Sequence, residues 1–173
     1  MYSNFEIDRA LRSLTVLVDT REQSTPALQK RLAALGVPYR RKKLDFGDYS
    51  AEVVLPSGKA RELSDKVCIE RKMNLDELCG CFTTGRGRFE REFTRAKDAG
   101  AKVYLLVERA DWEKLLSGKY RSRMSPESLS ASVLAWCARY GLVPLFCKPE
   151  TTGRMIGKIL RYEAKVLLEK GLI

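Results

Sequence analysis

A chain of 173 residues that is 45% hydrophobic and 31% charged has the size and composition of one globular domain, which excludes a second domain of comparable size. Its formal net charge of +10 favours a polyanionic partner, nucleic acid first, although a solvated basic surface or one lying on an acidic membrane would carry the same excess. The absence of histidine excludes the familiar nucleophilic triads, and no apolar run is long enough to span a membrane.

The first half of the chain predicts strands joined by polar turns. The apolar, β-branched run at residues 15–19 ends in a carboxylate, as in a buried strand that delivers one polar side chain. A helix is predicted to begin at Thr25-Pro26 and to end before Gly36. Further strands are predicted at residues 37–44, 47–55 and 66–72, with a turn at 56–58 and a polar loop before the last strand.

The second half alternates helices with strands. Helical spacing runs from Leu75 to Gly100 with an interruption at residues 83–88, and its phenylalanines are predicted to lie in the core. The remaining elements are a strand at 102–107, a short helix at 111–116, a long helix capped at Ser125-Pro126, a strand at 142–147 and a terminal helix from about 151 to 170. This order predicts one α/β domain, but it fits many folds, so function must be inferred from the site.

Glu70 and Lys72 form the most informative pair of residues. Strand side chains alternate, so both point to one face of the strand at 66–72 while Ile69 and Arg71 point to the other. Metal-dependent cleavage of a phosphodiester needs carboxylate oxygens to hold Mg²⁺ and a lysine that orients or deprotonates the attacking water. Taken alone, however, a Glu-x-Lys pair on a strand is more often a solvated or cross-strand pair.

Three further acids stand at or beyond the ends of apolar strands. Asp48 is predicted to supply a second metal ligand and Asp19 a third. Each also has a simpler explanation, because Gly-Asp commonly marks a turn, and Asp19 or Glu22 could cap the following helix. The acids together favour a metal site, because they recur where strands converge in a basic protein that lacks other catalytic groups.

Three ordered motifs in this chain resemble the XPF-type structure-specific endonuclease domain. V-D-x-R-E lies at residues 18–22, G-D-Y at 47–49 and E-R-K-x-x-x-D at 70–76, and a Gly-Arg segment at 87–89 and an apolar strand ending in an acid at 103–108 follow. The likeness spans about residues 15–147. It implies a restriction-endonuclease-like three-layer fold, a central mixed sheet flanked by helices, and cleavage of branched DNA such as flaps, forks or junctions.

The resemblance implies a role for each matching residue. The residues implied in catalysis are Asp19, Glu22, Asp48, Glu70, Arg71 and Lys72. Of these, Asp19, Asp48 and Glu70 would bind Mg²⁺, with Mn²⁺ as an alternative, Lys72 would serve the water, and Glu22 would support the metal shell. Arg71 would add its backbone carbonyl as a ligand.

Arginines are the expected DNA contacts. Arg21, together with Arg71, would touch phosphate or lock the acids in place. The other predicted contacts are Arg86, Arg88, Arg91 and Arg95. Any one of these last four fits a solvated helix face equally well, and Phe89, Phe93 and Trp136 are predicted in the core rather than as platforms for base stacking.

The leading hypothesis is an active DNA endonuclease, and the alternative is a catalytically inactive DNA-binding or partner subunit on the same fold. A third class, a protein-interaction domain, would leave the net charge unexplained. The resemblance also implies a homodimer through about residues 125–170. The chain ends at Ile173 without a helix-hairpin-helix module, as in phage or prophage members of the group. Because the sequence shows no pattern of a secretory signal or a membrane span, we expect a soluble, cytoplasmic protein, in the host cell if it is viral.

Overall fold

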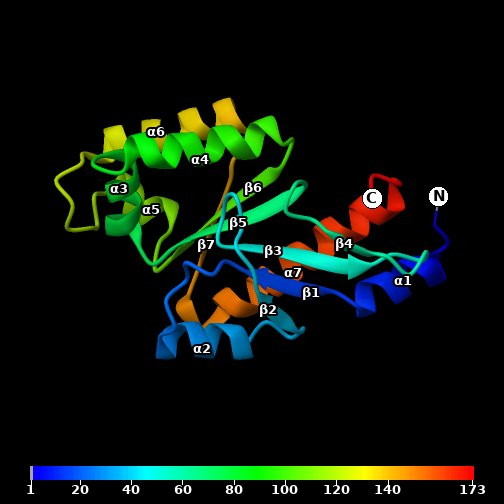
Figure 1. Ribbon diagram of the computed structural model, residues 1–173. Coiled ribbons are helices and arrows are strands. Elements are labelled where there is room, and N and C mark those ends of the chain that lie inside the picture. Colours follow the sequence, from blue (N-terminus) through cyan, green and yellow to red (C-terminus); the bar gives the residue numbers. More distant parts are fainter. Residues whose placement is uncertain (1) are drawn as a thin grey trace.

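The apolar runs of the sequence form one mixed sheet of seven strands with helices on both faces, in a computed structural model that describes residues 2–173 (Figure 1). The strands are β1 Thr15–Val18, β2 Tyr39–Arg41, β3 Tyr49–Val54, β4 Ala60–Glu62, β5 Val67–Lys72, β6 Lys102–Glu108 and β7 Val143–Cys147. The helices are α1 Asn4–Arg12, α2 Pro26–Ala33, α3 Leu75–Phe82, α4 Arg86–Asp98, α5 Trp112–Leu116, α6 Pro126–Tyr140 and α7 Pro149–Glu169.

The strand order is β2-β1-β3-β5-β6-β7, and β4 pairs with β3 off this path. β5, β6 and β7 are parallel, as are β1 and β2, whereas β3 runs antiparallel to β1, β4 and β5. β3 and β5 share one residue pair in their ladder, Tyr49 with Ile69. The two parallel groups therefore meet through β3, where the second and third motifs adjoin.

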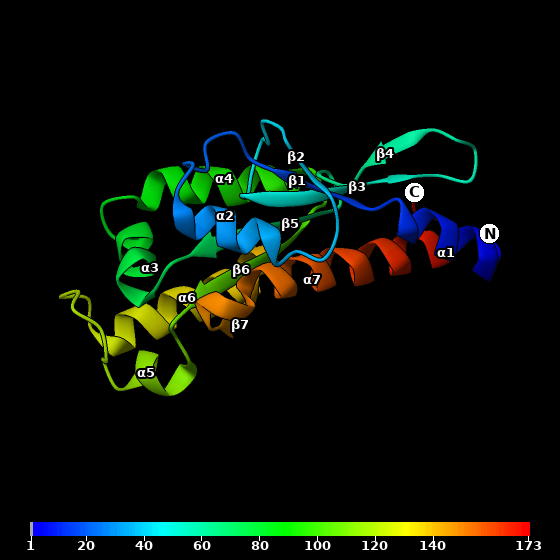
Figure 2. The ribbon, with the colours of Figure 1, turned by 90° about the horizontal axis from the view of Figure 1, so that it is seen from below.

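Each face of the sheet carries its own hydrophobic core. On one face, α1, α2 and α7 cover Val16, Val18 and Ile69, and α7 runs the length of this face (Figure 2). On the other face, α3 to α6 enclose an aromatic cluster in which Phe82, Phe89, Phe93 and Trp136 contact one another edge-on or stacked. The predicted core positions of Phe89, Phe93 and Trp136 are thereby confirmed. These aromatic side chains are packing groups and cannot stack on bases.

Helices α2 and α7 lie in direct backbone contact because two glycines of α7 face α2. A methyl group at Gly153 would stand 2.1 Å from the Arg31 carbonyl oxygen, and one at Gly157 would stand 2.2 Å from the Leu35 carbonyl oxygen. No side chain fits at either distance, so only glycine allows this approach. The contact fixes the depth at which α2 sits on the sheet.

Several predicted boundaries were wrong. The strand predicted at 37–44 is only Tyr39–Arg41, since the backbone of Leu44 turns to donate to the Asp19 carboxylate. The predicted polar loop contains β4, because Gly58, with a φ of 83°, closes a hairpin with β3. The interruption predicted at 83–88 ends early, as α4 begins at Arg86. No helix within residues 2–173 has the length and apolarity needed to cross a membrane.

Helix α1 was missed altogether. It begins with a capping box in which the Ser3 hydroxyl accepts from the Glu6 backbone N–H and the Glu6 carboxylate accepts from the Ser3 backbone N–H. Its buried side chains, Ile7, Ala10 and Leu11, pack into the core beneath α7. The Ser-x-x-Glu pattern was a readable signal for this helix.

Candidate active site

Asp48 enters the site through an unusually close approach of two backbones. Gly47 has a φ of 72°, and a methyl group added there would lie 2.9 Å from Cβ of Cys68 on β5. Glycine is therefore required just before Asp48. The Asp48 backbone N–H donates to the Ile69 carbonyl, and its Oδ2 accepts from the Arg71 backbone N–H at 2.8 Å. The carboxylate thus takes the place of a main-chain partner in the ladder between β3 and β5.

Glu70 and Lys72 lie on one face of β5, as alternation predicted. The Lys72 ammonium donates to Oε1 of Glu70 at 2.5 Å and lies 5.3 Å from the centre of the Phe89 ring. Both side chains are buried, with relative exposures of 5% for Glu70 and 9% for Lys72. Phe89, on α4, thus forms an apolar floor beneath an ion pair, and a cation is stabilised over such a ring.

The surroundings of Asp48 and Glu70 disfavour the charged form of both carboxylates. Burial raises the pKa of Asp48 well above its usual range, and the Glu70 carboxylate adds to the effect. Burial also raises the pKa of Glu70, although the Lys72 ammonium opposes it. Burial alone would lower the pKa of Lys72, but the neighbouring Glu70 outweighs it and raises the value, so Lys72 is a firmly protonated ammonium. As an ammonium paired with Glu70, Lys72 can donate hydrogen bonds within the site.

Glu92 of α4 joins this group and was not anticipated from the sequence. Its Oε1 accepts from the Gly47 backbone N–H at 2.9 Å, which ties α4 to the turn that presents Asp48. Its charge also contributes to the raised pKa of Glu70. Glu92 is one of several acids on an arginine-rich helix, so no local pattern distinguished it.

Arg71 lies on the opposite face of β5, where Arg31, Arg71 and Glu108 form an arginine cluster. Arg31 and Glu108 are buried, and Arg71 is partly buried. The Arg71 guanidinium donates to both oxygens of Glu108, at 3.0 and 2.6 Å, and Arg31 approaches the same carboxylate at 3.7 Å. Thr152 of α7 donates to Glu108 at 2.7 Å. The cluster lines a cavity of about 540 Å³ between α2 and the start of α7. The Arg71 side chain therefore joins β5 to Glu108 at the end of β6, and only the Arg71 backbone contacts Asp48.

Arg31 extends the arginine cluster to Glu22. Its Nη1 donates to the Tyr49 hydroxyl at 2.8 Å and to Glu22 at 3.2 Å, while the Tyr49 hydroxyl donates to Glu22 at 2.8 Å. The Glu22 charge also raises the pKa of Asp48, so Glu22 lies near the site, engaged with Arg31 and Tyr49. Arg31 was missed from the sequence, although its place among Leu28, Leu32 and Leu35 on an apolar helix face indicated a buried charge with a partner.

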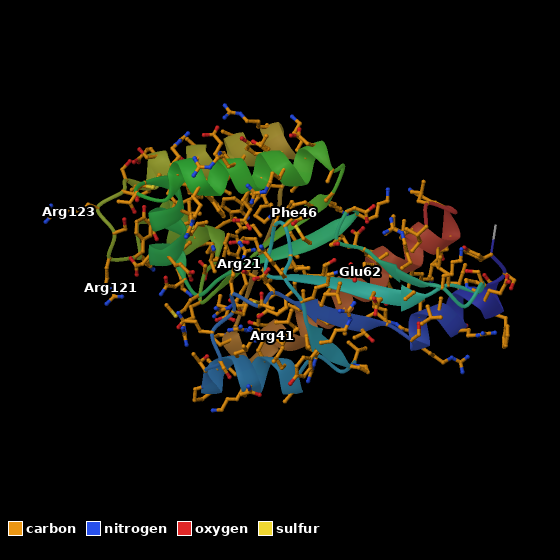
Figure 3. All side chains as sticks on the ribbon, viewed as in Figure 1. Arg21, Arg41, Phe46, Glu62, Arg121 and Arg123 are labelled. Atoms are coloured by element: carbon orange, nitrogen blue, oxygen red, sulfur yellow. The ribbon has the colours of Figure 1, made fainter. Side chains whose placement is uncertain are left out.

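Asp19 is fully buried and makes its own ion pair. Its two oxygens accept from the Arg21 guanidinium at 2.8 and 3.1 Å, from the Arg21 backbone at 2.7 Å and from the Leu44 backbone at 2.7 Å. Burial would raise the pKa of Asp19, but Arg21 outweighs it and lowers the value. The Asp19 carboxylate raises the pKa of Arg21, with smaller contributions from the charges of Glu92 and Asp48. Figure 3 shows Arg21 in the middle of the molecule. Arg21 thus holds the Asp19 carboxylate in a bidentate ion pair.

The donor chemistry of Asp48 and Glu70 suits a hard divalent cation. Burial and neighbouring acids, Glu70 for Asp48 and Glu92 for Glu70, disfavour the charged form of each carboxylate, and a positive ion would relieve this. Mg²⁺ commonly takes one or two carboxylates with water in its other positions. Over residues 2–173, however, no three His, Cys, Asp or Glu side chains are grouped closely enough to hold a metal ion. The predicted trio that includes Asp19 is thus not assembled as a ligand set, because Arg21 engages Asp19.

The four arginines predicted on the DNA side all belong to α4. Arg86, Arg88, Arg91 and Arg95 are exposed. Arg95 donates to the Asp45 carbonyl at 3.0 Å, so it also braces the segment before Gly47. Asp76, the last residue of the third motif, accepts from the backbone N–H groups of a later loop, at Arg121 and Ser122.

Comparison with known proteins places this arrangement in context. Residues 18–159 match the model of the ERCC4 domain family. The chain is similar to the structure of XPF from Aeropyrum pernix, with 27% identity and a TM-score of 0.62 over 91% of this chain and 68% of that one. For XPF from Aeropyrum pernix in complex with DNA, the identity is 26% and the TM-score 0.58, over 90% of this chain and 66% of that one.

The chain thus spans about two thirds of the length of these solved proteins. No curated protein matches its sequence. The predicted restriction-endonuclease-like fold, with its mixed sheet between two helical layers, is confirmed.

Proposed function

Because this chain belongs to the ERCC4 domain family, we propose that it is a metal-dependent DNA endonuclease that hydrolyses phosphodiester bonds in branched, flap or fork DNA. One observation supports the proposal most strongly: two carboxylates with raised pKa values, Asp48 and Glu70, adjoin the protonated Lys72 where β3 meets β5. A purely binding surface gains nothing from buried acids beside a phosphate. The DNA complex of the similar XPF from Aeropyrum pernix adds support for a nucleic-acid substrate.

Each residue of the proposed site has a defined task. Asp48 and Glu70 would hold Mg²⁺, or Mn²⁺, with the Arg71 carbonyl as a further ligand. The bound ion would neutralise charge on the phosphate and make its water more acidic. Lys72, paired with Glu70, would orient the attacking water or the phosphate by donating hydrogen bonds. Asp19 remains a predicted third ligand, and its use requires Arg21 to release it.

Arg71 and Glu22 would support the site without reacting themselves. The Arg71 backbone N–H fixes the Asp48 carboxylate, while its side chain is anchored by Glu108. Glu22 is held by Arg31 and the Tyr49 hydroxyl, from where its charge bears on Asp48. Glu22 would thus strengthen the negative field around the cation without binding it directly.

Cleavage of defined DNA substrates tests the proposal. Wild type, Asp48→Asn, Glu70→Gln and the control Glu169→Gln, an exposed acid at the end of α7, are incubated with labelled flap, fork and linear duplexes, with and without Mg²⁺. We expect Mg²⁺-dependent cutting of the branched substrates by wild type and control. Both site variants lose cleavage yet bind DNA at least as tightly, because one negative charge has left the phosphate site. If wild type binds every substrate and cuts none, the protein is the inactive binding subunit.

Homodimerisation through about residues 125–170 stays a prediction. Leu134 on α6 and Tyr162 and Val166 on α7 are exposed by 55%, 64% and 40%, which provides apolar surface within this range. Light scattering at several concentrations measures the mass directly. A mass of one chain, near 20 kDa, at all concentrations would contradict the prediction.

A further inference from the structure

A basic loop between α5 and α6 stands apart from the rest of the surface. Its residues Lys119, Arg121 and Arg123 are all exposed, and Figure 3 shows Arg121 and Arg123 projecting from the body of the molecule. The Arg121 side chain is 91% exposed. Across residues 2–173, Lys119 and Arg123 make no ion pair, and Arg121 has only a long contact of 3.5 Å with Asp76. The loop thus offers three cations that the protein itself leaves largely unneutralised.

The backbone of this loop is nevertheless fixed. Asp76 Oδ1 accepts from the backbone N–H groups of Arg121 and Ser122, at 2.7 and 2.8 Å. The Tyr120 hydroxyl donates to the Met124 carbonyl at 2.9 Å, and both side chains pack against the aromatic core. Two N–H groups donating to one oxygen lower the pKa of Asp76, although burial opposes the shift. Because the backbone of the loop is fixed and its lysine and arginine side chains stay free, the loop is suited to bind anions held at fixed spacing.

We propose that the loop Lys119–Arg123 binds DNA phosphates beside the active site and that Asp76 is its positioning residue. This inference rests on the proposed function. Asp76 stands at the start of α3, four residues after Lys72, so the loop is tied to the helix that leaves the catalytic strand. The loop exposes cations and polar groups while Tyr120 and Met124 point inward, which fits a phosphate backbone and lacks the aromatic anchors of a protein interface.

The test separates binding from cleavage. DNA affinity is measured without divalent cations, over a range of salt, for wild type, for Arg121→Ala/Arg123→Ala, and for the control Lys165→Ala/Lys170→Ala. The control removes the same charge from the far end of α7, which lies away from α3 (Figure 1). We expect the loop variant to bind on the order of tenfold more weakly, with a salt slope smaller by about one to two phosphates. The control keeps the wild-type slope.

Asp76 is then substituted both in the wild-type chain and in the Arg121→Ala/Arg123→Ala chain. Asp76→Ala is expected to weaken binding in the wild-type chain but to add little in the Arg121→Ala/Arg123→Ala chain, because the residues act as one unit. Asp76→Asn retains the accepting oxygen and is expected to restore most of the binding. We expect these substitutions to raise Kd and KM and to leave kcat unchanged. Thermal unfolding of every variant checks that the fold is kept.

Two results would overturn the inference. Wild-type affinity and salt slope in Arg121→Ala/Arg123→Ala would show that the loop does not touch DNA. Loss of kcat in Asp76→Asn with unchanged binding would make Asp76 a group of the reacting centre. Because binding is read without metal, a chain that binds DNA but never cuts it refutes the proposed function while still deciding the role of the loop.

Discussion

Replacing Gly157 by alanine tests how tightly α2 is held against α7. The added methyl group would stand 2.2 Å from the Leu35 carbonyl oxygen, where ordinary contact begins at 3.4 Å. A backbone oxygen cannot rotate away, so Leu35, two residues beyond the end of α2, must move by roughly 1 Å and draw the helix with it. Overpacking of this kind costs about 1–3 kcal/mol, and the upper end applies here because no side chain can yield. The better helix propensity of alanine returns only about 1 kcal/mol.

The expected net effect is a loss of about 2 kcal/mol in the free energy of unfolding, or roughly 4–8 °C in Tm for a chain of this length. Urea denaturation followed by the fluorescence of the buried Trp136 measures it. The matched control is Gly80→Ala in α3, where an added methyl group meets no atom within 4 Å and should stabilise by about 1 kcal/mol.

A Gly157→Ala protein that is as stable as wild type would refute this reasoning. It would mean that α2 can shift on the sheet without cost. The same shift would withdraw Arg31 from Glu22, Tyr49 and Glu108, so we also expect impaired cleavage in Gly157→Ala but not in Gly80→Ala.

Three further outcomes follow from the charges of the site. Glu108→Gln should lose about 3 kcal/mol of stability at pH 7, because Arg31 and Arg71 lose a buried partner. Burial opposes the lowered pKa of Glu108 but Arg71 prevails, so this stabilisation is present above about pH 4 and vanishes as pH falls further, which urea unfolding across pH would show. Asp48→Asn should have the opposite effect on stability. The raised pKa of Asp48 makes its charge a cost above about pH 4, so the variant gains stability at pH 8 and none at pH 4, and an equal gain at both would contradict the assignment. Finally, log–log plots of DNA affinity against salt should be linear with a slope near −0.9 per neutralised phosphate, whereas a flat plot would exclude phosphate contacts.

The features that follow from local patterns could be predicted from the sequence. Alternation along β5 placed Glu70 and Lys72 on one face, and the polar residues Thr25 and Ser125 marked the starts of α2 and α6. These depend on the geometry of a single strand or helix end, which neighbouring residues determine. β4 was missed because Ala60–Glu62 is short, carries two charged residues and no β-branched or aromatic one, and becomes a strand only by pairing with β3.

The partners of the site residues could not be read in the same way. Glu92 meets Gly47, and Glu108 meets Arg71 and Arg31, through contacts between residues 37 to 77 positions apart in the chain. The motif at residues 18–22 predicted that Asp19 would bind a metal, yet Arg21 of the same motif engages it in the structure. Whether a carboxylate meets a metal ion or an arginine depends on the surrounding tertiary packing, which the spacing of residues does not specify.

β3 and β5 share one ladder pair, and further contacts of the Asp48 segment hold the seam between these strands. The Asp48 backbone N–H donates to the Ile69 carbonyl, the Asp48 carboxylate accepts from the Arg71 N–H, and Gly47 leaves no room for a side chain against Cys68. The main chains of both strands therefore set where Asp48 stands relative to Glu70. A substitution that widens this seam, such as a larger residue at position 47, would separate the two carboxylates even though both acids were kept.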